Sequence, residues 1–301
     1  MKKPVTPAEL GGEEQRPDVS RALSVSDWRA GQSTQVTDNI ICETAVALVY
    51  NGISHVVMMA TPDHVEDFAL GFSLTEGILE NPSQLYDVSV TSRGGDPVVG
   101  SKDIGSTEVK GIEVAMEISS ERFAMLKEAR RNLTGRTGCG LCGAESLEQA
   151  IRQPKPVTGN HQFQHYAIER AVAQLEAHQP LQSLTGAVHG AALCDRAGNI
   201  KLVREDVGRH NALDKLFGAL CRQQNQLLNT GLLSDHFILI SSRASYEMVV
   251  KAAVMGVEML VAVSAATQLA VDLAVQVNLT LVGFARPGRH MVYSHAQRIV
   301  N

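Results

Sequence analysis

Short apolar runs separated by turn residues dominate the first third of the chain after its polar start. The runs 46–50 and 54–59 flank Asn51-Gly52, the strongest short signal for a β-hairpin. Residues 112–118 place Ile, Val, Met and Ile at every second position, which is the period of a half-buried strand. Residues 86–91 also have the composition of a strand. These patterns predict four strands in this part of the chain.

Two helices are expected beside these strands. Thr61-Pro62 supplies an N-cap and an N1 proline, and the following residues place apolar side chains on one helical face as far as Glu76-Gly77. Ser120 is expected to cap a second helix that ends near Asn132. Residues 21–134 therefore predict a small N-terminal α+β module, preceded by a flexible leader over residues 1–20.

The second half alternates strands and helices. The predicted strands are 187–194, 200–204, 237–240, 259–263 and 279–284, and the predicted helices are 166–178, one carrying Leu213 to Leu220, 246–255 and 268–277. The first two strands form a hairpin around a glycine turn. The later strands are apolar along their whole length, which is typical of an α/β layered sheet covered on both faces. Residues 153–301 are thus expected to form an α/β domain with a mixed sheet.

Composition and charge exclude several classes of protein. The chain has 301 residues, of which 44% are hydrophobic and 20% charged, as in soluble globular proteins. Its net charge of -5 argues against a general nucleic-acid or membrane-surface binder. No run approaches the roughly 20 apolar residues of a spanning helix, and the start lacks the apolar core of a signal peptide. A cytoplasmic protein is expected, with no nucleic acid or membrane as partner.

The five cysteines do not suggest a disulfide framework, because their number is odd and the expected compartment is reducing. Cys42, Cys194 and Cys221 lie in apolar or helical contexts and are predicted to be buried thiols. The other two, Cys139 and Cys142, form a Cys-x-x-Cys pair within Gly135 to Gly143. Their surroundings point to chemistry.

Glycines flank and separate this pair, so residues 135–152 are predicted to be an exposed loop followed by a helix start. Arg136 precedes Cys139 by three residues, and a cation or a helix N-terminus near a thiol favours the nucleophilic thiolate. The spacing alone leaves four possibilities open: half of a zinc site, a dithiol redox pair, a pair of cluster ligands, or a sulfur-carrying thiol.

The zinc possibility lacks a second Cys-x-x-Cys or paired histidines at standard spacing. His189 could complete a His/Cys/Cys set like that of the nucleobase deaminases. In this sequence Ala191 stands where those enzymes have their glutamate, and Gly138 stands where they have proline. Deaminase chemistry is therefore not expected, although a related fold is.

Polar residues collect after three strands of the second half. The candidates are Asp206, Arg209, His210 and Asn211 after the first, Arg243 after the second, and Phe284, Ala285, Arg286, Pro287, Gly288 and Arg289 after the third. Open α/β sheets bind ligands at these strand ends, because backbone N–H groups and helix dipoles face outward there. Two arginines around a Pro-Gly turn suit a phosphate or a guanine nucleotide. The sequence therefore predicts one pocket for an anionic ligand.

Together these motifs resemble the formate dehydrogenase accessory sulfurtransferase family, FdhD. The resemblance rests on Asn51-Gly52, Thr61-Pro62, Leu70-Gly71-Phe72, Glu76-Gly77, Gly135 to Gly143, Thr185-Gly186 with His189, Glu205 to Ala212 with Asp214-Lys215, and Phe284 to Arg289. The cysteine loop and the Glu-Asp-Val-Gly-Arg-His-Asn run are the specific ones. The family's fold, similar to that of cytidine deaminases, implies a layered α/β/α domain with a mixed sheet beside the smaller module.

The resemblance also implies a function. Members accept sulfur as a cysteine persulfide from a cysteine desulfurase and pass it to the molybdenum (or tungsten) bis-guanine-dinucleotide cofactor that formate dehydrogenase needs. By this resemblance Cys139 carries the persulfide, Cys142 is the second cysteine, and Phe284 to Arg289 bind the guanine-nucleotide end, which GDP should mimic. His189, Asp206, Arg209, His210, Asn211 and Arg243 are weaker candidates for cofactor contacts. A homodimer without a tightly held metal is expected.

Two other classes remain as alternatives. In a zinc-stabilised nucleotide-binding module, Cys139, Cys142 and His189 would hold metal without sulfur transfer. In a dithiol oxidoreductase, the two cysteines would cycle through a disulfide. Metal analysis of the purified protein and an insulin-reduction assay distinguish them from a sulfur carrier.

Overall fold

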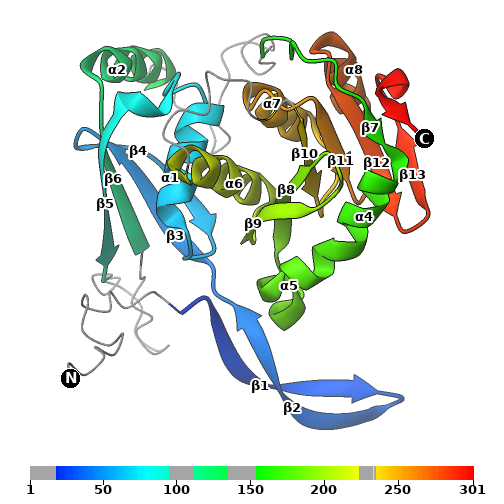
Figure 1. The fold of residues 1–301 in the computed structure, drawn as a ribbon. Helices are drawn as coiled ribbons and strands as arrows, with labels where there is room; N and C mark the ends of the chain where they lie inside the picture. The colour runs from blue at the N-terminus through cyan, green and yellow to red at the C-terminus, as the bar shows by residue number, and fades with distance from the viewer. Residues whose placement is uncertain (1–17, 95–110, 135–153, 224–232, 234) are drawn as a thin grey trace, which may run out of the picture.

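The computed structural model describes residues 18–94, 111–134, 154–223, 233 and 235–301. Two sheets of unequal size stand side by side with helices between and around them, and a two-stranded ribbon leaves the body at its base (Figure 1). The predicted α/β class is confirmed.

The smaller sheet confirms the four strands predicted for the N-terminal module. Its strand order is β4-β3-β6-β5. The strands are β3 (Thr44–Tyr50), β4 (Ile53–Ala60), β5 (Leu85–Arg93) and β6 (Gly111–Ile118). Asn51 and Gly52 form the turn between β3 and β4 with φ of 45° and 77°, as an Asn-Gly hairpin turn requires.

The first helix begins later than predicted. α1 spans Val65–Thr75, and the residue at its N-cap position is His64, with a φ of 53°. Thr61 does not cap this helix, because its hydroxyl accepts a bond from the Val207 amide in the other half of the chain. The predicted end of the helix at Glu76-Gly77 is confirmed, since Glu76 is the C-cap residue.

The second helix, α2 (Ser120–Thr134), begins one residue before its expected start. The Ser119 hydroxyl, not that of Ser120, accepts the bond from the Arg122 amide, at 3.4 Å. The Arg122 side chain is buried and donates to Ile78 O at 2.7 Å and to Glu80 at 2.6 Å. These bonds fix α2 against the segment that follows α1.

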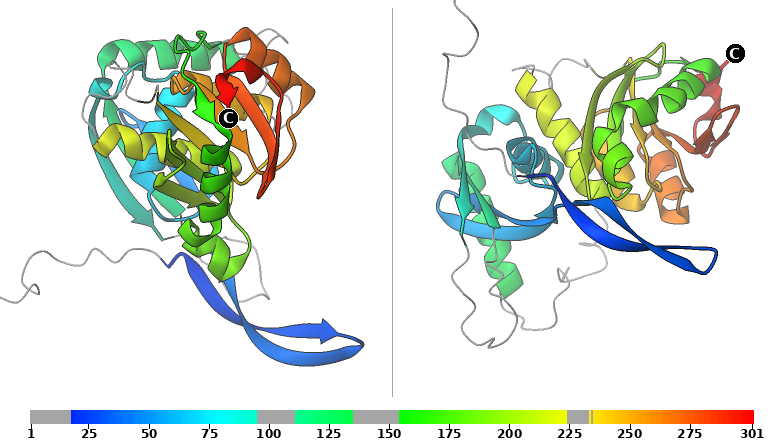
Figure 2. Two further views of the ribbon diagram at one scale, coloured as in Figure 1. Left: turned by 45° about the vertical axis from the view of Figure 1, so that its right-hand side comes forward. Right: turned by 90° about the horizontal axis from the view of Figure 1, so that it is seen from below.

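A β-ribbon occupies residues that the sequence pattern left without an element. β1 (Ser20–Arg29) and β2 (Gln32–Ile41) pair antiparallel over their whole length around the turn Ala30-Gly31, whose φ values are 50° and 82°. The ribbon extends away from both sheets (Figure 2). Most of its side chains are exposed, and most of the polar ones among them are serine, threonine or glutamine. The predicted leader therefore ends before Ser20.

The larger sheet has six strands in the order β13-β12-β11-β10-β8-β9. They are β8 (His189–Asp195), β9 (Ile200–Asp206), β10 (His236–Ile240), β11 (Met259–Ala262), β12 (Thr280–Arg286) and β13 (Arg289–Val292). The strands β10, β11 and β12 are parallel, whereas β8 and β13 run antiparallel to their neighbours, so the sheet is mixed as predicted. β13 was not predicted.

Helices cover both faces of this sheet. One face is covered by α4 (His165–Leu175), and the other by α6 (Arg209–Gln223), α7 (Tyr246–Val254) and α8 (Gln268–Gln276). The remaining short helices are η1 (Pro82–Gln84), η2 (Glu176–His178), α5 (Pro180–Thr185) and η4 (Ala296–Arg298). The short strands β7 (Phe163–Gln164) and β14 (Ile299–Val300) pair with each other. Along β10, Phe237 and Leu239 belong to the apolar cluster shared with α4, and Ile238 and Ile240 to the one shared with α6 and α7. The predicted layered α/β/α arrangement is confirmed.

The backbones of α1 and α6 touch where the two halves meet. A Cβ added to Gly71 would lie 1.8 Å from Asp214 O, and one added to Gly218 would lie 1.8 Å from Asp67 O. Glycine at both positions lets the two helices approach more closely than any side chain would allow.

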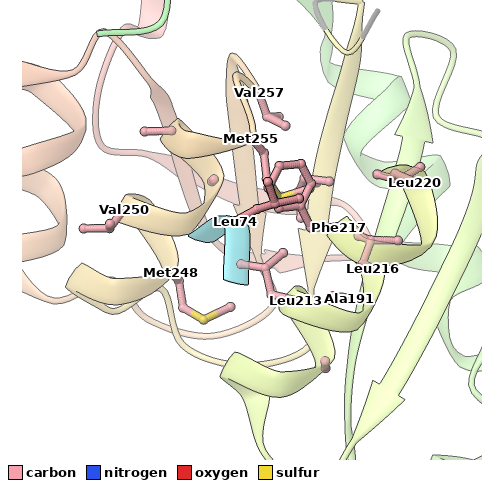
Figure 3. Packing of buried hydrophobic residues seen from close by; sticks show 14 of the residues in the cluster. Leu74, Ala191, Leu213, Leu216, Phe217, Leu220, Met248, Val250, Met255 and Val257 are labelled. Atoms are coloured by element: carbon pink, nitrogen blue, oxygen red, sulfur yellow. The ribbon is translucent and has the colours of Figure 1, made fainter. Parts of the chain in front are cut away.

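This close approach places apolar residues of both halves in one core. Leu74 of α1 lies in the same cluster as Leu213 and Phe217 of α6 and Met248 and Met255 from α7 and its C-terminus (Figure 3). The two sheets thus divide the chain between its predicted N- and C-terminal parts, while a single apolar core runs through both.

Candidate functional site

The strand directions bring the three predicted polar segments to one edge of the larger sheet. β9, β10 and β12 all end at this carboxyl edge, and β8 begins there with His189, which pairs with Asp206 in the ladder. Four strand spacings of about 4.8 Å separate β9 from β12, so their ends lie about 19 Å apart. The edge therefore suits an elongated ligand better than a single phosphate group.

Hydrogen bonds that involve the backbone hold the loops along this edge together. The Gly190 amide donates to Ser241 Oγ at 2.9 Å, and the Phe284 amide donates to Ser264 O at 2.9 Å. An isolated parallel bridge joins Ala244 to Ala266 in the loops after β10 and β11. The polar groups of the edge are thus carried on a connected backbone.

The segment Phe284 to Arg289 is the most exposed part of the edge. A β-bulge between Gly283 and Arg286 interrupts the pairing of β12 with β13, and Phe284 has a φ of 49° with 39% of its surface exposed. An aromatic residue in the left-handed region is a rare and strained conformation that often marks a functional site. Pro287 and Gly288 form a tight turn between the two strands.

The two arginines of this turn are both exposed, but they differ in the bonds of their guanidinium groups. Arg286 is exposed, but its Nη1 donates to Val263 O at 2.6 Å, which fixes the guanidinium against the loop that follows β11. Arg289 is exposed, and no bond to its guanidinium is found within the described residues. Ala285, also predicted to contact the ligand, is fully buried in the apolar cluster beneath α4. The accessible residues are therefore Phe284 and Arg286 to Arg289.

A second group of polar residues lies where β8 and β9 meet α6. Burial lowers the pKa of the half-buried His189, and the positive charges of Arg209 and His210 act in the same direction while Asp206 opposes them. His210 Nε2 lies 2.6 Å from Glu247 Oε2 in the first turn of α7. The hydrogen bond from His210 lowers the pKa of Glu247. Sequence reasoning missed Glu247, whose only signal is its position in the first turn of a helix after a strand.

The buried Nε of Arg209 has no partner within the part of the chain that the structure describes. Arg243, after β10, is exposed at the same edge. Because burial and the nearby charge of Arg209 lower the pKa of His189, its ring acts as a hydrogen-bonding group at neutral pH and not as a positive charge. Arg209 and Arg243 are thus the members of this group that can offer positive charge to a ligand.

Asp206 and Asn211, both predicted as weaker candidates for cofactor contacts, lie in a buried network of hydrogen bonds. The Asp206 carboxylate is fully buried, 2.6 Å from the equally buried Lys215 Nζ, and it accepts bonds from the Thr61 and Gly208 amides at 3.0 and 2.8 Å. Asn211 Nδ2 donates to Asp206 Oδ1 at 3.0 Å and to Met59 O at 2.9 Å. Both side chains are occupied within the protein, which argues against direct contact with a ligand.

Thr61 completes this buried network from the N-terminal half. Its carbonyl oxygen accepts a bond from Lys215 Nζ at 2.9 Å, and its hydroxyl accepts one from the Val207 amide at 3.1 Å. A second buried network joins Lys251 to both oxygens of Asp214, at 2.9 Å each, and to Thr75 Oγ1 at 2.8 Å. We call these two networks together the seam, because each joins α1 or its flanks to α6 or α7.

The cysteines differ in whether the structure describes them and in how deeply they are buried. Cys139 and Cys142 lie outside the described residues, so their predicted roles stay predictions. Cys194 and Cys221 are buried as predicted, and burial raises the pKa of both thiols, that of Cys221 to about 12. Cys42 is half-buried, so its predicted full burial was wrong. Thiols with raised pKa values are poor nucleophiles, so Cys194 and Cys221 do not compete for sulfur chemistry.

Within the described residues, no three histidine, cysteine, aspartate or glutamate side chains lie close enough together to hold a metal ion. Of the proposed zinc ligands only His189 is described. None of the described helices is long and apolar enough to span a membrane.

These features define a layered α/β protein that presents loops of a mixed sheet, with an exposed Arg-Pro-Gly-Arg turn, as its candidate binding edge. Residues 41–300 match the model of the FdhD/NarQ family. The chain belongs to this family, as the resemblance of its motifs implied.

Individual relatives agree with this assignment. The chain is 49% identical over 295 residues to the sulfur carrier protein FdhD of Cupriavidus necator, covering 98% of this chain and 94% of the relative. It is 46% identical over 276 residues to the sulfur carrier protein FdhD of Xanthomonas euvesicatoria pv. vesicatoria, covering 92% and 91% of the two chains. A crystal structure described as that of a formate dehydrogenase accessory protein from Desulfotalea psychrophila shares the fold, with a TM-score of 0.68, 19% identity, and coverage of 94% of this chain and 100% of that one.

Proposed function

We propose that this protein is a cytoplasmic sulfurtransferase that carries sulfur to the molybdenum bis-guanine-dinucleotide cofactor required by formate dehydrogenase. Membership of the FdhD/NarQ family and the name of its close relatives, sulfur carrier protein, support a role in sulfur transfer. The Cys139-x-x-Cys142 pair supplies thiols in a glycine-rich segment. The cofactor is the substrate here, not a resident group.

The first step is a persulfide exchange. The Cys139 thiolate attacks the terminal sulfur of a desulfurase persulfide, the S–S bond of the donor breaks, and the donor cysteine leaves as its thiolate. Cys139 then carries one additional sulfur atom, so atoms and electrons balance without a further reactant. Arg136, three residues before Cys139, favours the anionic forms of this sulfur by its charge.

The observation that carries the cofactor assignment is the exposed turn at the carboxyl edge. Arg286 and Arg289 offer guanidinium groups to a pyrophosphate, and Phe284 presents an aromatic ring that can stack on a guanine base. Arg209 and Arg243 extend the positive charge toward the far end of the edge. A dinucleotide group has the length and the charge that this edge would accommodate.

Mass spectrometry after incubation with a cysteine desulfurase and cysteine tests the first step. We expect one added sulfur atom on Cys139 of the wild-type protein and none on the Cys139→Ala variant. Cys42→Ala, which removes a half-buried thiol elsewhere, is the matched control and should load sulfur as the wild type does. Sulfur found on Cys42 alone, or full activation of formate dehydrogenase by Cys139→Ala, would refute the assignment.

Two further measurements concern the alternatives. Stoichiometric zinc in the purified protein, lost in the Cys139→Ala variant, would favour a zinc-stabilised nucleotide-binding module over a sulfur carrier.

We also propose that the protein is a homodimer, which sedimentation velocity would show as a single species of twice the chain mass.

A further inference from the structure

A cavity lies at the opposite edge of the larger sheet, where β11 and β12 begin. It has a volume of about 300 Å³ and is lined by Asn160, His161, Gln162, Arg196, Gln297 and Arg298. All six lining residues are polar, and three of them are arginine or histidine. Volumes near 300 Å³ mark the lower end of small-molecule sites. The strands of the sheet separate this cavity from the turn at Arg286 to Arg289.

A buried carboxylate positions the histidine of this cavity. Glu258 is fully buried and accepts bonds from the His161 amide and from His161 Nδ1, both at 2.7 Å. Because a carboxylate accepts and does not donate, Nδ1 carries the proton and Nε2 remains for a ligand in the cavity. A Cβ at Gly159 would lie 1.6 Å from Glu258 Oε1, so the loop 159–162 can wrap this carboxylate only with glycine there.

Arg298 forms the rigid wall of the cavity. It is 2% exposed, and its guanidinium donates to Gly159 O at 2.8 Å, to Asn160 Oδ1 at 3.1 Å and to Asn278 O at 2.8 Å. These bonds tie the loop 159–162 to the start of β12. Arg298 therefore supplies positive charge near the cavity while its donors serve the protein.

Arg196 is the arginine with donors to spare. It is exposed in the turn between β8 and β9, and Nε alone is used, in a bond to Gln162 O at 3.0 Å. No partner of its two terminal nitrogens is found among the residues that the structure describes. Its anchored Nε holds the planar guanidinium at the cavity, with two nitrogens able to bind an oxyanion through a fork of N–H groups.

We propose that this cavity is a second anion site, which binds a tetrahedral oxyanion of the size of phosphate. Two guanidinium groups against one buried carboxylate give the cavity a positive balance in a protein whose net charge is -5. Arg196 makes the principal contact, and the side-chain amides of Gln162 and Gln297 can donate to the other oxygens of the anion. His161 Nε2, which accepts when Nδ1 carries the proton, can take a hydrogen bond from a phosphate hydroxyl. The site is independent of the proposed sulfur transfer and of the nucleotide edge.

Titration calorimetry of the whole protein with inorganic phosphate at constant ionic strength tests this site. We expect saturable binding of one phosphate at the cavity and a loss of affinity of about tenfold or more in Arg196→Gln, because two charge-assisted hydrogen bonds are removed. Arg21→Gln makes the same change of charge on the exposed ribbon and should leave the affinity unchanged. His161→Gln, which can keep an amide bond to Glu258, should give a smaller loss.

Titration of phosphate in the presence of saturating GDP separates the cavity from the nucleotide edge, because GDP would occupy that edge and should leave the phosphate affinity of the cavity unchanged. Phosphate binding that is lost with GDP but kept in Arg196→Gln would overturn the proposal, as would binding that persists in Arg196→Gln at the wild-type affinity, which indicates an adventitious ion only. Acetate that binds as tightly as phosphate would also overturn it, because a planar carboxylate does not fill a site for a tetrahedral anion.

Discussion

The seam and the Arg286 to Arg289 turn both carry charged residues at or near the carboxyl edge of the larger sheet, yet they use charge in opposite ways. In the seam, Asp206 and Lys215 are fully buried, 2.6 Å apart, and every bond they make is to the protein itself. In the turn, the Arg289 side chain is exposed, and no bond to its guanidinium is found within the described residues. Residues of the same chemical type thus hold the halves together in one place and remain available to a ligand in the other.

This difference shows why a polar run in a sequence is an imperfect guide to a site. The run Asp206 to Lys215 contains buried members, Asp206, Asn211 and Lys215, and half-buried ones, Arg209 and His210. Substitutions in the seam should therefore act on folding, and substitutions in the turn should act on binding.

The largest effect is expected from Lys215→Met. The change leaves the Asp206 carboxylate buried without its cation, which costs about 3–5 kcal/mol in the free energy of unfolding. Urea denaturation followed by circular dichroism measures it. Asp27→Ala is the matched control, since it breaks an ion pair with Arg29 whose side chain is 86% exposed, and such pairs contribute below about 1 kcal/mol. Equal losses of unfolding free energy in the two variants would show that burial does not make the ion pair of the seam more important for stability than an exposed one.

A smaller effect, on binding and not on stability, is expected from Arg289→Ala. The loss of one charge-assisted contact should weaken GDP binding about tenfold, while the unfolding free energy changes by less than about 0.5 kcal/mol. Titration with GDP and urea denaturation of the same sample measure both quantities. Arg286→Ala should also weaken GDP binding, with an added loosening of the turn because its bond to Val263 O is lost. Unchanged GDP affinity in both variants would remove the turn from the binding edge.

The smallest effect is expected from Glu247→Gln, because this residue belongs neither to the seam nor to the turn. The bond from His210 holds the pKa of Glu247 below its ordinary value of 4.5, so the ionised group stabilises the folded state above that pH. This contribution is lost as the pH falls through the folded-state pKa. Because the side chain is 64% exposed, the difference from the wild type at neutral pH should stay below about 1 kcal/mol. Stability curves measured from pH 7 down to pH 3 should converge at the acid end, and curves that diverge there would contradict the assignment.

The regular elements with strong periodicity could be predicted from the sequence. The Asn51-Gly52 hairpin, the helix α4 and the apolar strands β10 and β11 all follow from local patterns of side chains. The ribbon β1–β2 was missed because its serine, threonine and glutamine residues show no apolar alternation and little of it is buried. The strand β13, which follows the Pro-Gly turn, was missed because it is only four residues long.

The candidate edge could be predicted in outline and not in detail. Strand ends after apolar runs are visible in the sequence, and parallel pairing brings them to one edge. The burial of Asp206 depends on Thr61, which lies 145 residues earlier, and no local pattern reports such a contact. Ala285 and Phe284 lie within the β-bulge of β12, where Ala285 is buried and Phe284 has a positive φ. Neither feature can be predicted from the sequence, because the bulge depends on how β12 pairs with β13.

The contact between α1 and α6 has a consequence for how this protein is made in the cell. Leu74 of the early helix shares its core with residues as late as Leu281, so this core cannot be completed until about 207 more residues have left the ribosome. At typical rates of about 5–20 residues per second this takes about 10–40 s. During that interval the newly made N-terminal part exposes apolar surface that chaperones recognise, and its folding waits for synthesis of the rest of the chain.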